Sequence, residues 1–151
     1  MRTRPLLLAL AVLAAAPTAH AQGLSLWLGA GRPVSDSGAL KFKTSDVYAA
    51  AQFDLPVFPM ALRVEGMVAG SNLRSAPRSY FASAVFPVRL GIMTPYGIAG
   101  YGAYSYGKVQ ETRGYNYGGG VRLGMGRTGF FAEMRRHEKL NKTQGTIGMT
   151  F

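Results

Sequence analysis

The last nine residues of the chain alternate between two kinds of side chain, and this pattern limits the possible folds more than any other. In Thr143–Phe151 one face carries Gly145, Ile147, Met149 and Phe151, whereas the opposite face is polar apart from one glycine. A period of two residues predicts a β-strand, because successive side chains of a strand point to opposite faces. The chain therefore ends in a strand with one apolar face and a terminal aromatic residue.

The N-terminus has the features of an export signal. Arg2 and Arg4 precede Leu6–Ala16, an apolar run of about a dozen residues that is too short to cross a bilayer as a helix. Ala19–Ala21 then supplies the small residues of a cleavage site. We predict that residues 1–21 are a cleavable signal peptide and that residues 22–151 form the exported domain. The alternative, a buried N-terminal helix, does not account for the order of these three features.

The composition of the chain is typical of a small membrane barrel. The 151 residues include 20 Gly, 8 Tyr and 8 Phe but only 16% charged residues and no Cys. Tyrosines are common at membrane interfaces, and glycines allow a narrow lumen to close. The absence of Cys excludes disulfides and a lipid-modified N-terminal Cys, and no apolar run is long enough for a transmembrane helix. These features, together with the export signal, predict a β-barrel in the outer membrane.

The net charge favours an anionic lipid surface over nucleic acid as the partner. Removing the two arginines of the signal peptide from 17 Lys and Arg leaves 15, against 7 Asp and Glu, a net charge of +8. The sequence has no basic helix and no run of Lys or Arg, and export separates the protein from nucleic acid. We therefore expect no nucleic-acid binding and expect contact with anionic lipid.

Alternation and turn residues together predict eight strands, each about the length that a tilted strand needs to cross the hydrocarbon core. They are Leu24–Gly31, Val47–Leu55, Ala61–Ala69, Ser79–Val88, Pro95–Ser105, Tyr115–Met125, Gly129–His137 and Thr143–Phe151. Gly and Tyr fall on both faces of Pro95–Ser105, so the phase of that strand stays open. An even number of strands places both termini in the periplasm. An open sheet edge is not viable in lipid, so the first strand must pair with the last.

The connections between these strands are consistent with this topology. Connections after odd strands should be long and polar and face outward, whereas those after even strands should be short. The odd connections are Gly31–Asp46, Gly70–Arg78, Tyr106–Gly114 and Glu138–Lys142, and the even ones are Pro56–Met60, Arg89–Thr94 and Gly126–Thr128. The sequence thus predicts an all-β fold: an eight-stranded, antiparallel, up-and-down transmembrane β-barrel preceded by a cleavable signal peptide.

Five charged residues fall on the predicted inward face of the strands. They are Arg63, Glu65, Arg122, Glu133 and Arg135. Buried charges persist only when they are paired, and an eight-stranded barrel is just wide enough inside for side chains. We therefore expect these five residues to form a salt-bridge network that plugs the lumen. The functional alternative is a gate that rearranges to pass small ions.

The chain resembles the small eight-stranded outer-membrane barrels of the OmpA/OmpX-like superfamily over essentially its whole mature length. The resemblance is carried by Leu62–Gly66, Pro95–Gly102, Tyr117–Gly124, Phe131–Arg135 and Ile147–Phe151. It implies that the barrel-assembly machinery recognises Phe151 as an assembly signal. Members of this superfamily serve in structural anchoring, adhesion and complement resistance, so the resemblance implies a fold and a membrane rather than one task.

The predicted outer loops are rich in cations. From Arg32 to Lys142 they hold ten Lys and Arg against four Asp and Glu, a net charge of +6. The outer leaflet presents lipid phosphates, and each basic residue near an anionic surface contributes on the order of 1 kcal/mol. We expect Lys41, Lys43, Lys139 and Lys142 to contact lipopolysaccharide, although a solvated loop surface would have the same composition.

Aromatic residues near the predicted strand ends complete the membrane interpretation. Tyr80, Tyr96, Tyr104, Tyr115 and Tyr117 are expected to lie at the two membrane interfaces.

Nothing in the sequence indicates an enzyme. Some barrels of this size modify lipid A, one class being a deacylase with His, Ser and Glu near the membrane surface. His137 is the only histidine after the signal peptide, position 139 is Lys where such a deacylase has Ser, and Ser105 is the nearest serine upstream. A nucleophile needs a base within hydrogen-bond reach, so His137 is expected to be a loop residue at the outer rim. We expect no cofactor and no metal site.

These observations predict a non-enzymatic, monomeric barrel of the cell outer membrane that contributes to envelope structure or to surface interactions such as adhesion. The alternatives are a narrow gated pore for small ions, a lipid A-modifying enzyme, and a soluble periplasmic barrel that holds a ligand. The last would need apolar residues inside and charges outside. The alternation of Leu62, Arg63, Val64 and Glu65 favours the opposite arrangement.

Overall fold

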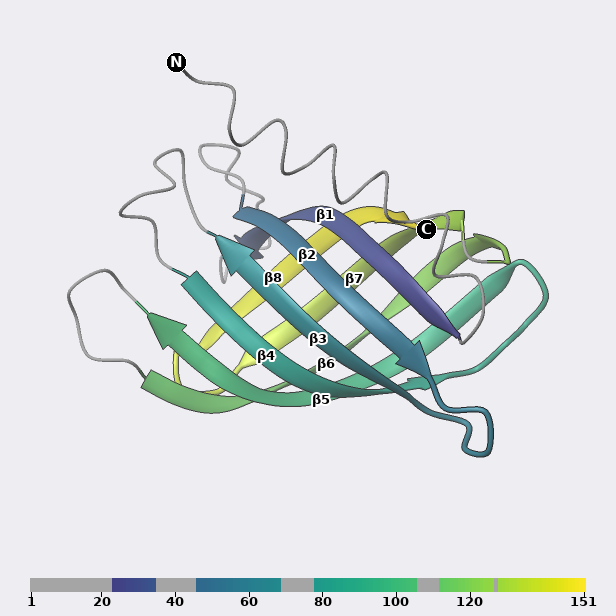
Figure 1. The fold of residues 1–151 in the computed structure, drawn as a ribbon. Coiled ribbons are helices and arrows are strands. Elements are labelled where there is room, and N and C mark those ends of the chain that lie inside the picture. Colours follow the sequence, from purple (N-terminus) through teal and green to yellow (C-terminus); the bar gives the residue numbers. More distant parts are fainter. Residues whose placement is uncertain (1–22, 35–45, 69–77, 106–111, 127) are drawn as a thin grey trace, which may run out of the picture.

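The computed structural model describes residues 23–34, 46–68, 78–105, 112–126 and 128–151, and these residues form a closed barrel of eight strands (Figure 1). The strands are β1 (Leu24–Val34), β2 (Asp46–Asp54), β3 (Ala61–Val68), β4 (Arg78–Pro87), β5 (Met93–Ser105), β6 (Thr112–Met125), β7 (Thr128–His137) and β8 (Lys142–Thr150). The predicted signal peptide, residues 1–21, lies outside the described residues. No helix among the described residues is long and apolar enough to cross a membrane.

Each strand pairs with its neighbours in sequence, all antiparallel, and β1 closes the ring by pairing with β8. Beyond the end of β8, Phe151 continues this seam, because its N–H donates to the Leu26 carbonyl and the Leu26 N–H donates to the Phe151 carbonyl, both at 2.9 Å. The predicted fold class, an eight-stranded antiparallel up-and-down barrel, is therefore confirmed. We call the end where β1, β3, β5 and β7 finish the loop end and the opposite end the turn end (left and right in Figure 1).

The side chains are partitioned inside out, as the alternation predicted. In β3, Arg63 and Glu65 are only 1% and 4% exposed, whereas Leu62 and Val64 are 49% and 66% exposed. Every second residue of β7 from Gly129 to His137 is buried, and the residues between them are exposed. The lumen therefore holds Arg63 and Glu65, whereas Leu62 and Val64 lie on the outer wall.

The structure settles the phase of β5, which the sequence left open. Tyr96, Ile98 and Tyr104 are buried on the inward face, whereas Tyr101 is exposed on the outward face. The predicted interfacial positions of Tyr96 and Tyr104 are therefore wrong, while Tyr80, Tyr115 and Tyr117 lie outward as expected. Repeated Gly and Tyr on both faces gave β5 no apolar alternation, so only the pairing with β4 and β6 fixes which tyrosines point inward.

Glycines on β6 and β8 leave room for large rings inside the narrow barrel. A Cβ atom at Gly120 would lie 2.6 Å from the Tyr96 hydroxyl, and one at Gly148 would lie 2.7 Å from the Phe131 ring. Side chains at these two positions would displace the rings. The rings pack with Trp27, whose centroid lies 5.7 Å from that of Tyr96 and 4.8 Å from that of Phe131.

One connection departs from the predicted pattern of long odd and short even connections. Residues 138–141 join β7 to β8 in a tight turn in which the Asn141 N–H donates to the Glu138 carbonyl at 3.1 Å. Asn141 has a φ of 48°, a left-handed conformation that asparagine tolerates better than most residues. This odd connection is shorter than the even connection formed by residues 55–60. The other three connections at the loop end lie largely outside the described residues.

Candidate functional site

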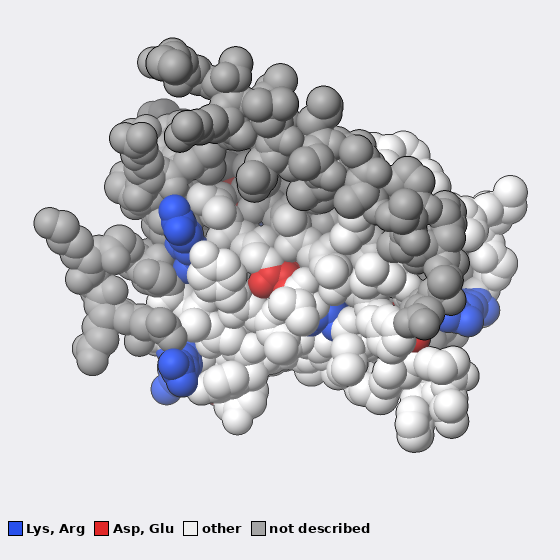
Figure 2. All heavy atoms as spheres, in the orientation of Figure 1, with Lys and Arg blue, Asp and Glu red and all other residues white. Residues whose placement is uncertain are grey.

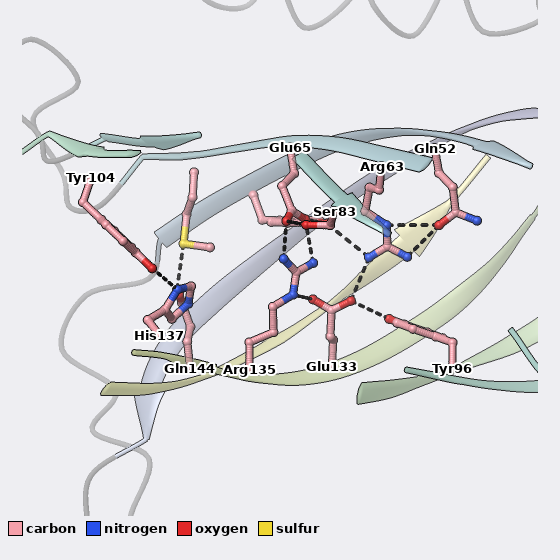
Figure 3. A network of polar contacts seen from close by, with 12 residues as sticks. Gln52, Arg63, Glu65, Ser83, Tyr96, Tyr104, Glu133, Arg135, His137 and Gln144 are labelled. Carbon is pink, nitrogen blue, oxygen red and sulfur yellow. Dashed lines mark hydrogen bonds and ion pairs between the residues drawn. The ribbon is translucent and has the colours of Figure 1, made fainter. Parts of the chain in front are cut away.

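The candidate site is a chain of ion pairs that crosses the lumen between opposite walls (Figure 3). Arg63 and Glu65 lie two residues apart on β3, so both side chains point inward. Glu133 and Arg135 lie two residues apart on β7, and β7 is four strands from β3 in a ring of eight. β3 and β7 run in the same direction, because both are odd-numbered strands of an up-and-down barrel. The order Arg-x-Glu on β3 therefore faces the order Glu-x-Arg on β7. Opposite charges therefore meet at two successive levels.

Four charged side chains form one continuous, charge-balanced series. The Arg63 guanidinium donates to Glu133 Oε2 at 2.7 Å. Arg135 bridges the two carboxylates: its Nε donates to Glu133 Oε1, and its Nη1 and Nη2 donate to Glu65, the latter at 2.6 Å to Oε2. None of the four side chains is more than 7% exposed. We call Arg63, Glu65, Glu133 and Arg135 the lumen ion chain.

Neutral groups satisfy the remaining positions on the lumen carboxylates. Glu65 accepts hydrogen bonds from the Tyr48 hydroxyl at 2.8 Å and from the Ser83 hydroxyl at 2.9 Å. Glu133 accepts one from the Tyr96 hydroxyl at 2.8 Å. Buried ions are tolerated when their hydrogen-bonding capacity is used in this way, because removal from water is otherwise costly.

Arg63 is also held by partners on β1 and β2. Its Nε and Nη2 both donate to Gln52 Oε1, at 3.0 and 2.7 Å. Its guanidinium carbon lies 3.8 Å from the centroid of the Trp27 ring, within the range of a cation–π interaction. The pair of hydrogen bonds and the aromatic face restrain the plane of the guanidinium group, so the orientation of Arg63 does not depend on Glu133 alone.

Arg122 does not belong to the lumen ion chain, contrary to the prediction of a five-residue network. Its Nε donates to the Thr150 hydroxyl at 2.9 Å, and its Nη2 donates to the Gly126 carbonyl. These partners lie at the turn end of the barrel, because Gly126 follows β6 and Thr150 ends β8. Arg122 is on the inward face as predicted but lies at a different level along the barrel axis.

The lumen ion chain separates two small cavities. The cavity on the turn side has a volume of about 100 Å³ and is lined by residues including Trp27, Gln52, Arg63 and Arg122. The cavity on the loop side measures about 10 Å³, roughly the space for one water molecule. Glu65, Glu133 and Arg135 line the second cavity, so the ion chain is the partition between the two.

His137 lies inside the barrel rather than at a loop rim, so that expectation is wrong. It is the last residue of β7 and is 4% exposed, and its Nδ1 lies 2.6 Å from the Tyr104 hydroxyl of β5. The same half of the lumen contains Gln144, whose amide nitrogen lies 3.1 Å from Asp46 Oδ2 and 2.7 Å from the Met67 sulfur. His137 thus pairs with a phenol in a packed interior.

Asn116 of β6 is also buried but, unlike His137 and Gln144, its side chain has no described hydrogen-bond partner. It is 1% exposed. It is paired in the sheet with His137 on one side and Gly100 on the other. Within the described residues, no group of three or more His, Cys, Asp or Glu side chains is arranged to hold a metal ion.

The predicted lipopolysaccharide-contacting lysines are only partly described. Lys139 and Lys142 are exposed at the loop end, Lys139 in the turn after β7 and Lys142 at the start of β8. Lys41 and Lys43 lie outside the described residues. Phe151, the predicted assembly signal, is partly exposed at the turn end of the β1–β8 seam.

Sequence reasoning found the charged members of the site but missed their neutral partners. The sequence suggested no lumen role for Tyr48, Gln52, Trp27 or Ser83, and Tyr96 was predicted at a membrane interface instead. The signal was present for Tyr48 and Gln52, because both share the inward face of β2 and β2 pairs directly with the charged strand β3.

Comparisons with known proteins support the fold. No protein-family model matches the sequence, and no curated protein matches it. The crystal structure of the N-terminal β-barrel domain of Pseudomonas aeruginosa OprF is similar, with a TM-score of 0.69 at 13% identity over 86% of this chain and 97% of that chain. Neisserial surface protein A (NspA) has a TM-score of 0.57 at 15% identity over 84% of this chain and 92% of that chain. The chain thus has the fold of small eight-stranded outer-membrane barrels, as its resemblance to the OmpA/OmpX-like superfamily implied.

Proposed function

We propose that this chain is an integral protein of the outer membrane whose lumen is sealed and which acts through its outer surface, in envelope structure or in surface interactions. The observation that carries the proposal is the inside-out partition. An apolar wall surrounds a lumen ion chain whose side chains are at most 7% exposed. A soluble barrel of this size would expose its charges and bury its aliphatic residues. The likeness to OprF and NspA supports the same location.

Fractionation and gel electrophoresis test the membrane location. Full-length protein expressed in a Gram-negative host is expected in the outer-membrane fraction. It is also expected to migrate anomalously on a gel until it is boiled, because a closed barrel resists detergent. Recovery in the soluble periplasmic fraction would refute the proposal. The same experiment with residues 2–21 deleted tests the predicted signal peptide, since the deleted protein should stay in the cytoplasm.

A narrow gated pore is the second candidate, and the lumen ion chain supplies the observation in its favour. The lumen ion chain is charge-balanced and has a cavity on each side. A change in which of its residues form ion pairs would connect the two cavities. We favour the sealed state because every residue of the lumen ion chain has at least one ion-pair partner of opposite charge. In planar bilayers we expect no unitary current above the leak. Regular current steps from purified protein would favour the pore.

We further propose that the protein has no enzymatic activity. The environment of His137 supports this, because its described partner is the Tyr104 phenol inside the lumen. Mass spectrometry of lipid A from cells with and without the protein should give identical spectra. A loss of acyl chains that depends on His137 would overturn this part of the proposal.

The partners follow from the same proposal. We expect lipopolysaccharide to contact Lys41, Lys43, Lys139 and Lys142, the barrel-assembly machinery to recognise Phe151, and the folded protein to be monomeric. Charge reversal at the four lysines should weaken binding to purified lipopolysaccharide. Unchanged binding would exclude these lysines as the contacts. Replacing Phe151 with Ala should slow the appearance of folded protein in the outer membrane.

A further inference from the structure

Arginines and tyrosines lie side by side on the outer wall at the loop end. On β4, Arg78 and Tyr80 are two residues apart and therefore share the outward face, and on β6 the same holds for Arg113 and Tyr115. Arg136 of β7 lies directly opposite Tyr117 of β6 in the sheet register. All six side chains are exposed. We call Arg78, Tyr80, Arg113, Tyr115, Tyr117 and Arg136 the wall belt.

The belt residues form a connected surface across β4 to β7. Tyr101 of β5 contacts one of its members: it is paired with Tyr115, and the two ring centroids are 4.9 Å apart. Ala103, the next outward residue of β5, is paired with both Tyr80 and Arg113. Figure 2 shows Lys or Arg side chains at the loop end of the visible face, on the left, and also at the turn end, on the right.

The belt covers β4 to β7 and is absent from the β2–β3 side, whereas β1 carries Arg32 at an outward position. In the row of paired residues that contains Arg78, the neighbouring strands carry Val68 on β3 and Val47 on β2. These valines take the outward positions that arginine and tyrosine take on β4 and β6. A general need for solubility near the loops would apply equally to every strand, so it does not explain this arc.

The turn end of the wall lacks an equivalent belt among the described residues. Its outward positions are apolar, as shown by Leu24, Phe53, Phe86, Leu123 and Phe130. The exposed arginine described there, Arg89, lies in the connection after β4 and pairs with Asp54 at 3.4 Å. The two rims of the wall therefore face different chemical environments.

We propose that the wall belt binds the phosphate groups of the phosphorylated glycolipid in the outer leaflet. This inference rests on the proposed location in the outer membrane. Exposed tyrosines mark the boundary between hydrocarbon and headgroups, and Arg78 and Arg113 lie one outward position beyond them, towards the loops. Planar guanidinium groups bind phosphate with two parallel hydrogen bonds, so several of them on one wall can engage a headgroup that carries two phosphates.

This proposal assigns the lipid contact to the strands and is separable from the contact proposed for the loop lysines. A phosphate bound at the belt touches the side of the barrel, whereas Lys139 and Lys142 lie at its mouth. The belt also predicts that bound glycolipid clusters on the β4–β7 side. The β2–β3 side should be covered by lipids without a preferred position.

The test uses the full chain, refolded in detergent micelles and shown to be a folded barrel by its gel migration. The probe is lipid A that carries both glucosamine phosphates, and the triple variant Arg78→Gln, Arg113→Gln, Arg136→Gln is compared with the wild type. We expect the variant to bind about tenfold more weakly or worse. The matched control, Arg89→Gln at the turn end, should bind as the wild type does. Lipid A stripped of its phosphates should not distinguish the wild type from the triple variant.

The outcomes separate the belt from the proposed location. Equal binding by the wild type and the folded triple variant would overturn the belt. If Lys139→Gln with Lys142→Gln then removed binding, the contact would belong to the loops. Weaker binding of the variant to phosphate-free lipid A would also overturn the belt, because the loss would not depend on phosphate. Recovery of the wild type from the soluble periplasm would instead defeat the proposed location, whatever the binding results.

Discussion

Polar groups are buried with ionic partners in the middle of the lumen and with neutral or no described partners in its loop-side half. In the middle, Arg63, Glu65, Glu133 and Arg135 cross from one wall to the opposite wall, and each has several partners. In the loop-side half, His137 meets the Tyr104 hydroxyl, and the Asn116 amide forms no hydrogen bond with another described residue. The comparison indicates that ion pairs tie opposite walls together at one level, and we expect the neutral residues at the next level to contribute much less to stability.

Removal of Arg135 should produce the largest effect. The Arg135→Met variant leaves Glu65 without its ionic partner and deprives Glu133 of one of its two arginines, in a site with almost no access to water. We expect the free energy of unfolding to fall by about 3–5 kcal/mol, measured by urea denaturation in detergent micelles. Arg136→Gln, which changes an exposed residue next in sequence, should alter it by less than about 0.5 kcal/mol. Similar losses in both variants would contradict the importance of the ion chain.

A double-mutant cycle should reveal the coupling across the lumen. Arg63→Met and Glu133→Gln each remove one end of a buried ion pair, while Arg135 keeps Glu65 as a partner in both variants. The double variant should be more stable than the sum of the single effects predicts, with a coupling of about 2 kcal/mol. Additive losses in the unfolding titrations would show that the two residues do not act as a pair.

The neutral half of the lumen should respond less to the loss of one hydrogen bond. Tyr104→Phe removes the hydroxyl that lies 2.6 Å from His137 Nδ1, and we expect a loss of about 1 kcal/mol in unfolding free energy. Tyr101→Phe, on the exposed face of the same strand, is the matched control and should have no measurable effect. If Tyr104→Phe cost as much as Arg135→Met, the proposed contrast between the two halves would be wrong.

Asn116 should be the most tolerant buried polar residue. Asn116→Leu replaces an amide that has no described protein partner, and an apolar group of similar shape is expected to change stability by no more than about 0.5 kcal/mol, or to raise it. The same substitution at Gln52 removes two hydrogen bonds to Arg63 and should cost about 2 kcal/mol. The unfolding temperatures of the two leucine variants can be compared by gel shift after heating. A lower unfolding temperature for Asn116→Leu than for Gln52→Leu would contradict this prediction.

The sequence predicts which face a residue occupies better than it predicts the level along the barrel axis. The alternation in β3 and β7 was sufficient to place Arg63, Glu65, Glu133 and Arg135 inside. Arg122 has the same parity, but the stagger between strands puts it beside Thr150 at the turn end. This stagger depends on how all eight strands pair, and no single strand encodes it.

Strand ends and glycine-rich strands set the other limits. His137 continues the inward parity of β7, yet its position beside a turn made it resemble a loop residue. In β5 the alternation of Gly and Tyr hides which face is apolar, so Tyr96 and Tyr104 were placed at the interfaces although both lie inside. In both cases tertiary pairing supplies information that local pattern lacks.

The closed seam between β1 and β8 restricts how this protein can associate with others. Each of the eight strands has a hydrogen-bonded neighbour on both sides, so the described backbone offers no edge to which a further strand could be added. Strand addition, the route by which many sheets capture extended peptides or stack into fibrils, is therefore closed to the folded barrel. Any partner must be recognised through side chains on the wall or through the connections at either end.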